Sequence, residues 1–313
     1  MTIAKPEKRK RNLWISRRLG DFRVVTGVAA VIAAALILAE YAPAFFRADR
    51  SLQRVVSSGV IRVGYSTEAP YAFLTSTGQL TGVSPEIVRH VMGKLGVRDV
   101  RWRKSEFGDL LNELEAGHID MIAAGMFITS GRLQRVSFSH PVFTDPPGLL
   151  VAQGNPKNIS HYRQILDDPS IRLAVILGSI EEQVYRGIGV DPARVLAIPD
   201  IPTIRAAIAG GVADAIALPS SSVRRMAADD RFGRAEVNEG YVHPPDALPD
   251  ISAFACRKKD RALLRAINKE LAAFIGTEEQ VSLISSFGLT RGNVPSPSSR
   301  KGVPYHDRSN FND

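Results

Sequence analysis

Arg132 lies in a segment whose residue types are suited to binding the acid group of a small molecule. The segment reads Ala-Ala-Gly-Met-Phe-Ile-Thr-Ser-Gly-Arg over residues 123–132. An apolar strand over 120–124 is predicted to end at Gly125, where the missing Cβ lets a ligand approach the backbone. A hydroxyl residue then starts a short helix that carries the guanidinium. Because this fork of donors is planar and always charged, we predict that Arg132 binds a carboxylate; a surface arginine on a short helix is the alternative.

Further candidate residues follow other predicted strands, because small-molecule sites in open α/β sheets form outside the carboxyl ends of strands. Glu68 follows the first strand and is predicted to bind a cationic amino or amidinium group, unless it is a solvated loop acid. Aromatic faces attract delocalised cations by roughly 0.5–2 kcal/mol each, depending on desolvation. The candidate rings, each of which would be a core residue if taken alone, are those of Tyr71, Phe107 and Phe127.

Ser179 follows a glycine and precedes a predicted helix, which is a second place for a ligand group. Ser179 and Glu182 have the spacing of a capping box, which is mainly a structural role. The first amides of this helix could bind an anion or a carbonyl group, but Glu181 and Glu182 already occupy its positive end. We therefore assign the ligand carboxylate to Arg132.

Strand-like and helix-like stretches alternate along the chain, which predicts an α/β architecture. Residues 116–123 resemble residues 210–217, each as a helix end, a turn and a buried strand, which favours two small lobes built alike. The predicted strands are 60–65, 120–124, 172–176, 195–198, 213–218 and 251–256. Three predicted helices cover residues 110–117, 260–275 and 277–287. Three more are predicted to start at Ser84, as N-cap, after Ser179, and at Thr203.

The net charge of +8 is confined to the two ends of the 313-residue chain. Residues 1–23 contribute +6 and residues 291–313 contribute +2, whereas 28 basic and 28 acidic residues cancel between them. A basic face for nucleic acid is therefore not expected. Residues 291–313 are rich in Ser, Pro and charge, so we predict that this tail is disordered.

The basic residues 1–23 precede an uncharged apolar run over 24–39, within a predicted anchor or signal segment of 24–46. The length of this run lies between a signal-peptide core of about 7–15 residues and a spanning helix of about 20. Residues 42–44 could be a small-residue cleavage site, and a buried soluble helix is a third alternative. An uncleaved anchor is favoured. The positive-inside rule then keeps the amino terminus in the cytoplasm and the folded part in the periplasm.

Cys256 is the only cysteine, so no intrachain disulfide is expected, and its strand-like surroundings predict a small buried residue. No metal site or cofactor is predicted, because the six histidines are scattered and there is no phosphate-cradling glycine loop. A nucleophile–base pair is also absent from the sequence pattern. Composition and motifs therefore favour a binding protein over an enzyme.

Seven short segments resemble, in order, the periplasmic solute-binding proteins of ABC importers, polar amino-acid type (solute-binding family 3). They lie at 59–64 (Gly-Val-Ile-Arg-Val-Gly), 68–73 (Glu-Ala-Pro-Tyr-Ala-Phe), 78–82, 107–111, 116–120, 123–132 and 285–288. The resemblance covers about residues 54–290. The Glu-Ala-Pro-Tyr and Gly-Met-Phe-Ile-Thr stretches are most similar to ectoine- or hydroxyectoine-binding members, in which an aromatic also stands five residues before the carboxylate-binding arginine.

This resemblance implies a two-lobed type II periplasmic-binding-protein fold, with the ligand in the cleft between the lobes and two hinge crossovers. Lobe 1 is expected at 51–148 and 250–290, and lobe 2 at 149–249. The resemblance also implies a monomer that captures a small zwitterion in the periplasm. Its partners would be the ABC permease subunits in the inner membrane.

Pro219 departs from the pattern of amino-acid-binding relatives. These usually carry an acid five residues after the aspartate that matches Asp214, where the acid binds the α-ammonium group. Proline carries no charge, so Glu68 remains as the cation partner, which favours ectoine or hydroxyectoine. A polar amino acid is the alternative ligand. A periplasmic dehydratase on the same fold, with Glu68 or Asp145 as the acid, and a membrane-tethered sensor are the alternative classes.

Overall fold

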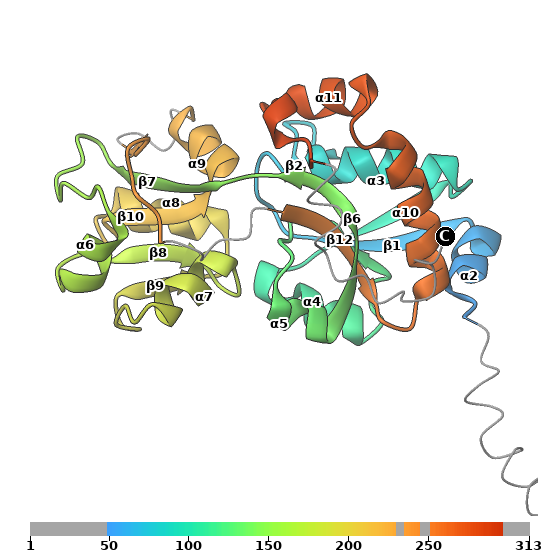
Figure 1. Ribbon diagram of the computed structural model, residues 1–313, viewed down its shortest axis with the longest axis horizontal. Coiled ribbons are helices and arrows are strands. Elements are labelled where there is room, and N and C mark those ends of the chain that lie inside the picture. Colours follow the sequence, from blue (N-terminus) through green and yellow to red (C-terminus); the bar gives the residue numbers. More distant parts are fainter. Residues whose placement is uncertain (1–48, 230–234, 245–250, 297–313) are drawn as a thin grey trace, which may run out of the picture. The chain divides into compact units, whose positions relative to one another are not determined.

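The computed structural model describes residues 49–229, 235–244 and 251–296. Two five-stranded sheets and the helices packed on them make up most of this part of the chain (Figure 1). A small hairpin of β2 (Phe73–Leu74) and β3 (Leu80–Thr81) stands apart from both sheets. The predicted α/β fold class is confirmed.

The first sheet combines strands from both ends of the described chain. Its strands are β1 (Val60–Tyr65), β4 (Asp99–Lys104), β5 (Met121–Ile122), β6 (Val136–Thr144) and β12 (Ile251–Arg257). Their order is β4-β1-β5-β12-β6, with β1 parallel to β4 and β5. β12 runs antiparallel to β5 and β6, so the chain returns to this sheet after building the second one.

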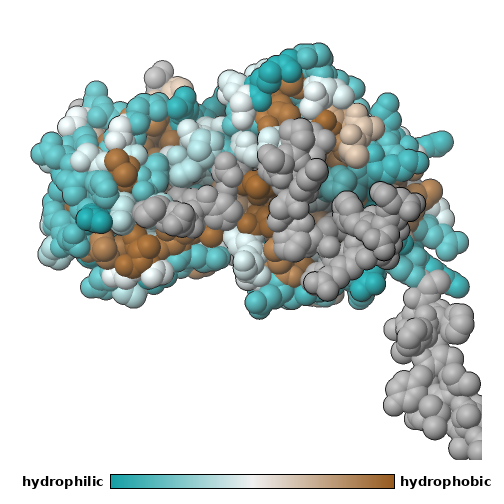
Figure 2. Space-filling model, in the orientation of Figure 1, coloured by the Kyte–Doolittle hydropathy of each residue, from teal (hydrophilic) through white to brown (hydrophobic). Residues whose placement is uncertain are grey.

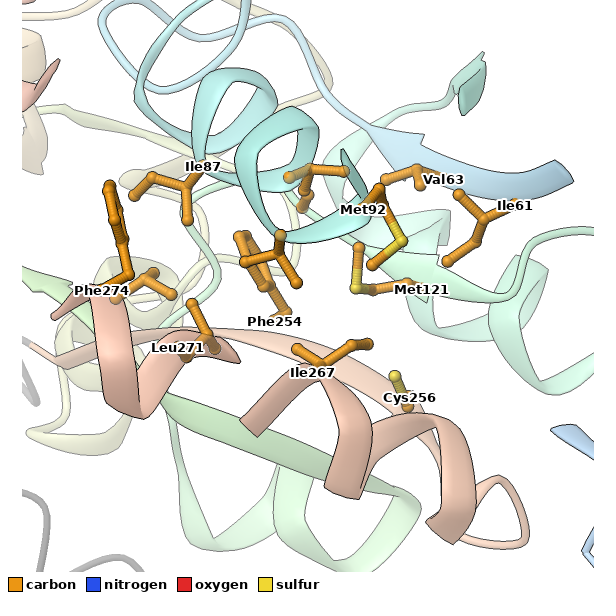
Figure 3. Close-up of a cluster of buried hydrophobic side chains, with 14 of the residues drawn as sticks. Ile61, Val63, Ile87, Met92, Met121, Phe254, Cys256, Ile267, Leu271 and Phe274 are labelled. Carbon is orange, nitrogen blue, oxygen red and sulfur yellow. The ribbon is translucent and has the colours of Figure 1, made fainter. Parts of the chain in front are cut away.

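Helices cover the first sheet and bury its apolar side chains. The helices are α2 (Ser51–Ser58), α3 (Val83–Lys94), α4 (Leu110–Glu115), α5 (Ser130–Arg135), α10 (Arg261–Phe274) and α11 (Glu278–Ser285). In Figure 3, Ile87 and Met92 of α3 lie opposite Ile267 of α10, with Phe254 and Cys256 of β12 in the same cluster. Cys256 is fully buried there, which confirms its predicted role as a small core residue.

The second sheet follows the crossing from β6 into β7. Its strands are β7 (Pro147–Ala152), β8 (Leu173–Ile176), β9 (Val195–Ile198), β10 (Ala215–Pro219) and β11 (Ala235–Val237). Their order is β11-β7-β10-β8-β9, with β8 parallel to β9 and β10. The helices of this part are α6 (Tyr162–Asp167), α7 (Ile180–Gly187), α8 (Ile201–Ala209) and α9 (Ser220–Ala227).

The prediction that Ser84 caps a helix is wrong, because α3 already begins at Val83. The backbone N–H groups of Val83 and Ser84 donate to the carbonyls of Pro70 (3.1 Å) and Tyr71 (3.0 Å), so a side-chain cap is not needed. Gly82 has φ +125°, and a Cβ there would lie 2.5 Å from the Tyr71 carbonyl oxygen. The start of α3 therefore fixes the loop after β1, which contains the candidate site residues Glu68 and Tyr71.

Other boundaries also differ from the sequence prediction. α8 starts at Ile201, two residues before the predicted start at Thr203, because Asp200 is its N-cap and the Asp200 carboxylate accepts from the Thr203 N–H (2.8 Å). The predicted disordered tail begins too early, because Arg291–Asn293 form a 3-10 turn and Asn293 donates to the Thr144 carbonyl (2.8 Å). Residues 297–313 lie outside the described part.

Within the described ranges, no helix is both long and apolar enough to cross a bilayer. The predicted segments 1–23 and 24–46 lie outside these ranges. On the face drawn in Figure 2, hydrophilic residues cover most of the coloured surface and hydrophobic residues form smaller groups.

The two similar stretches found in the sequence make equivalent contacts in the two sheets. Asp120, before β5, accepts from the backbone N–H (3.2 Å) and the Nε (3.0 Å) of Arg62. Asp214, before β10, accepts from the backbone N–H (2.8 Å) and the Nε (3.4 Å) of Arg172. In each sheet, an aspartate after a glycine turn thus ties one strand to its neighbour. This repetition supports two α/β units built alike.

Asp120 differs from Asp214 in being fully surrounded. It also accepts from Arg54 and from the buried Arg257 (2.9 Å). Although burial favours the neutral acid, bonds from Arg62 and Arg257 hold the pKa of Asp120 well below its usual range. This ion cluster fixes the strands behind the candidate site.

Candidate ligand-binding site

All eight residues predicted to bind a ligand line one pocket of about 320 Å³, open solvent at its mouth included. They are Glu68, Tyr71, Phe107, Gly125, Phe127, Arg132, Ser179 and Pro219. They come from the loop after β1, the 3-10 turn Phe107–Asp109, the segment after β5, and the carboxyl ends of β8 and β10. The rule that small-molecule sites form outside the carboxyl ends of strands accounts for this arrangement.

Arg132 is a buried residue, 4% exposed, and not the surface arginine of the alternative interpretation. Thr129 caps α5 by accepting from the Arg132 backbone N–H (3.2 Å), which fixes where the side chain starts. The guanidinium Nη1 donates to the Phe127 carbonyl (2.7 Å) and Nη2 to the Gly178 carbonyl (3.0 Å). It also lies over the Phe107 ring, with Cζ 5.4 Å from the ring centroid.

The charge of Arg132 persists despite this burial. Burial lowers the pKa of Arg132 to about 10, while the nearby Glu181 charge opposes the shift. A guanidinium has five N–H groups, and the two carbonyls occupy two of them within the described part of the chain. The same fork can therefore bind a ligand carboxylate.

Gly125 lines the pocket, but the contact that requires a glycine there is with the Tyr71 ring and not with a ligand. It has φ +66°, and a Cβ would lie 2.8 Å from the ring of Tyr71. The prediction that its missing Cβ serves ligand approach is corrected in this respect, because the Tyr71 ring occupies that space. The glycine allows the ring to pack against the end of β5.

Tyr71 has both a packed face and a polar contact in the site. Its ring stacks on Phe143 at 5.2 Å between centroids and 7° between planes, and its hydroxyl donates to Asp145. Asp145 follows β6, is 1% exposed, and also accepts from the Ser221 N–H (3.2 Å). Burial raises the pKa of Asp145, and the bonds from Tyr71 and Ser221 partly offset this. Asp145 is therefore satisfied by protein donors.

Glu68 lines the pocket, and its carboxylate accepts a hydrogen bond from α9, a helix that packs on the second sheet. Its Oε1 accepts from the Ser222 hydroxyl of α9 (2.6 Å), and its backbone exchanges hydrogen bonds with Ala72 (2.8 and 2.9 Å). Burial raises the pKa of Glu68 to about 8, and the Glu181 and Asp145 charges add to the effect. Glu68 is thus a site acid and not the solvated loop acid of the alternative interpretation.

Glu181 is a pocket residue that the sequence analysis assigned only to the charge of a helix end. It is 3% exposed, lines the pocket, and belongs to the buried face of α7 together with Ile180, Val184 and Tyr185. Burial raises the pKa of Glu181 to about 7, although hydrogen bonds from its own backbone N–H and from the Ser179 side chain, and the charge of Arg132, favour the carboxylate. The helical spacing of its apolar neighbours is the signal that could have placed Glu181 inside.

Ser179 and Pro219 form the second-sheet side of the pocket. Ser179 caps α7 by accepting from the Glu182 N–H (3.2 Å), as predicted. Glu182, however, accepts from the Gly178 N–H (2.7 Å), one residue before the position that a capping box requires. Pro219 ends β10 and gives this wall an uncharged surface beside Leu218.

The two sheets, the two crossings between them and the pocket define a type II periplasmic-binding-protein fold. The chain belongs to the bacterial extracellular solute-binding proteins, family 3, which it matches over residues 61–288. It is 28% identical over 265 residues to a probable amino-acid ABC transporter periplasmic-binding protein, y4tE, of Sinorhizobium fredii, covering 84% of this chain and 87% of that protein.

Two further similarities concern relatives with named ligands. The lysine/arginine/ornithine-binding periplasmic protein of Escherichia coli is 26% identical over 223 residues, covering 67% of this chain and 80% of that one. The crystal structure of EhuB in complex with hydroxyectoine superposes with a TM-score of 0.72 at 28% identity, covering 78% of this chain and 94% of EhuB. The chain is therefore a solute-binding protein of the amino-acid ABC transporter type, and its family implies an extracytoplasmic location.

Proposed function

We propose that this protein captures a small cyclic zwitterion, ectoine or hydroxyectoine, and presents it to an ABC permease for import. The observation that carries the proposal is one pocket in which a buried guanidinium, a partly buried acid and aromatic rings converge. In the proposed arrangement, Arg132 binds the ligand carboxylate. Glu68 binds the amidinium, which lies among the rings of Tyr71, Phe107 and Phe127.

The uncharged wall at Pro219 supports this ligand class. An α-ammonium group is a compact, strongly hydrated cation that needs an anion or several acceptors on each side. Pro219 supplies no anion at the position where amino-acid-binding relatives carry one, whereas a planar amidinium is satisfied by aromatic faces and by acceptors at its edges. The similarity to EhuB points in the same direction.

A polar or basic amino acid is the second candidate, favoured by the surplus of acids around the pocket and by the similarity to the lysine/arginine/ornithine-binding protein. Isothermal titration calorimetry on the full-length protein separates the two. We expect ectoine and hydroxyectoine to bind more tightly than glutamine, histidine or arginine. Tight binding of a common α-amino acid, with no heat from ectoine or hydroxyectoine, would overturn the first proposal and support the second.

A dehydratase activity is the third candidate, since Glu68 is an acid whose pKa of about 8 keeps it protonated at neutral pH. Because the relatives named above are transport proteins, we propose binding without turnover. Incubation with prephenate or arogenate should leave both compounds unchanged, as measured by ultraviolet absorbance. Formation of an aromatic product would contradict this expectation.

We also propose that the lobes are divided at the two crossings between the sheets, near residues 149 and 250, and that residues 24–46 tether the protein to the inner membrane. The antiparallel return of β12 to β6 supports the first point. The uncharged run over 24–39 supports the second.

A further inference from the structure

The pocket is surrounded by more acids than bases. Three carboxyl groups, those of Glu68, Asp145 and Glu181, influence one another there, and Arg132 is the cation among the pocket-lining residues. In the described part of the chain, none of the three acids forms an ion pair. Asp145 is bonded to Tyr71 and Ser221 and does not line the pocket. Glu68 and Glu181 also accept hydrogen bonds, from Ser222 and Ser179 respectively, but both line the pocket and are therefore the two acids that a ligand can reach.

Glu68 and Glu181 reach the pocket from the two different sheets. Glu68 follows β1 of the first sheet, and Glu181 lies in the first turn of α7, which packs on β8 and β9 of the second. Their carboxyl groups are close enough for the charge on Glu181 to disfavour ionisation of Glu68. A ligand between them would be contacted from both sides.

Few other charged groups act on this pair. Arg132 faces Glu181 from α5, and Tyr185 lies beside Glu181 on α7. Tyr71 and Asp145 act on Glu68 from the first sheet, and the Ser222 hydroxyl donates to it from α9. Arg224 of α9 acts on Asp145 but pairs with Glu239 at the surface (2.9 Å).

We propose that Glu181 is a specificity-determining residue: with Glu68 it brackets a planar cation that carries N–H groups on two edges, an amidinium or a guanidinium, and ligand binding expels one proton from this pair of acids. This inference rests on the proposed solute-binding function and deepens it. An amidinium shares its charge between two nitrogens, so each carboxylate can accept from a separate N–H. An ammonium has all its N–H donors on one nitrogen, so it can donate to both carboxylates only where they converge on that single atom.

The proton release follows from the same geometry. Arg132 offsets only part of the cost of ionising two carboxyl groups in one pocket, so without a ligand cation they do not both ionise fully near pH 7. Burial raises the pKa of Glu68 to about 8 and that of Glu181 to about 7, so the pair retains at least one proton near pH 7. A bound cation stabilises both carboxylates, and the displaced proton passes to solvent.

Calorimetry in phosphate and in Tris at pH 7, two buffers with different ionisation enthalpies, measures the protons released. We use ectoine as the amidinium probe and arginine as the guanidinium probe. Pipecolate, a six-membered ring with a carboxylate and one ammonium, is the comparison ligand that lacks an amidinium. About one proton should be released with ectoine, whose affinity should exceed that of pipecolate at least tenfold. From pH 6 to 7, ectoine affinity should rise by about tenfold for each proton that binding releases.

Glu181→Gln should reduce this proton release, because Glu68 alone then carries an exchangeable proton, and should reduce the preference for ectoine over pipecolate about tenfold. Glu236→Gln, an exposed glutamate on β11, is the matched control and should change neither quantity. A thermal melt of each variant verifies folding. Glu181→Gln with unchanged affinity and unchanged proton release would overturn the inference and leave the proposed function standing.

Arginine distinguishes failure of this inference from failure of the proposed function. Binding of arginine but not ectoine, with a released proton that depends on Glu181, would support the inference and overturn the ectoine assignment. If neither ectoine nor arginine binds, or if both bind without proton release, the inference is wrong.

Discussion

At the scale of single residues, Arg132 connects the two sheets. Its guanidinium donates to a carbonyl before α5 and to the carbonyl of Gly178 before α7, while the Phe107 ring lies against its face. A lysine could supply the charge but not this planar set of donors. Arg132 thus combines a structural contact between sheets with the charge that a ligand carboxylate needs.

Replacing Arg132 with Ala should weaken ligand binding at least tenfold, because loss of one partner of a buried charged pair costs about 2–5 kcal/mol. Arg132→Lys should also weaken binding, since the bidentate fork is lost. Calorimetry with ectoine measures the effect. Arg135→Ala, which removes a surface arginine from the same helix, is the control and should bind as the parent does. Unchanged affinity in both Arg132 variants would contradict the site assignment.

At the scale of elements, the turn before α7 approaches the 3-10 turn Phe107–Asp109 very closely. Gly178 has φ +77°, and a Cβ there would lie 2.8 Å from the Cα of Gly108. Because the obstructing atom is backbone, it cannot move aside as a flexible side chain can. This contact between turns of the two sheets sets the spacing across the pocket.

Gly178→Ala should therefore destabilise the protein more than Gly154→Ala does. Gly154 has nearly the same backbone conformation, φ +76°, but open space where its Cβ would stand. Each substitution costs roughly 1–2 kcal/mol for the left-handed backbone, and only Gly178→Ala adds the collision with Gly108. Thermal unfolding measures the difference, and calorimetry should show weaker ectoine binding for Gly178→Ala alone. Equal losses of thermal stability in both variants would show that the close approach of Gly178 to Gly108 does not contribute to stability.

At the scale of the whole molecule, the two pocket acids make the stability of the protein depend on pH. The pKa of Glu68 is raised to about 8 and that of Glu181 to about 7, both above the value of about 4.3 expected in an unfolded chain. Between about pH 4.5 and 8 these two acids therefore bind more protons in the folded protein than in the unfolded chain, which outweighs the opposite effect of burial on the pKa of the single residue His243. The free energy of unfolding must fall as pH rises through this range.

Without ligand, the protein should unfold more easily at pH 8 than at pH 5.5, by at most about 1.4 kcal/mol per pH unit for each of the two acids. Urea denaturation at several pH values measures this slope. The double variant Glu68→Gln/Glu181→Gln should have a flatter slope, whereas Glu236→Gln should behave like the parent protein. A parent protein whose stability increases steadily from pH 5.5 to 8 would contradict the prediction.

Local signals in the sequence predicted much of the fold and most of the residues that line the candidate pocket. The alternation of strands and helices, the glycine turns before Asp120 and Asp214, and the position of Arg132 after a strand depend on neighbouring residues. All eight residues that these signals selected line one pocket, because parallel strands bring their carboxyl ends to the same edge of a sheet. Such features depend on spacing along the chain.

Contacts between distant segments decided what the sequence pattern left open. The helix α3 starts at Val83 because carbonyls of the preceding loop accept its first N–H groups, and Gly125 is needed by the Tyr71 ring, 54 residues earlier in the chain. Glu181 turned inward because α7 packs its apolar face on the second sheet, and that burial raised its pKa. Local spacing thus selected the residues that meet at the pocket, whereas burial and partners, which exist only after packing, determined their charge and contacts.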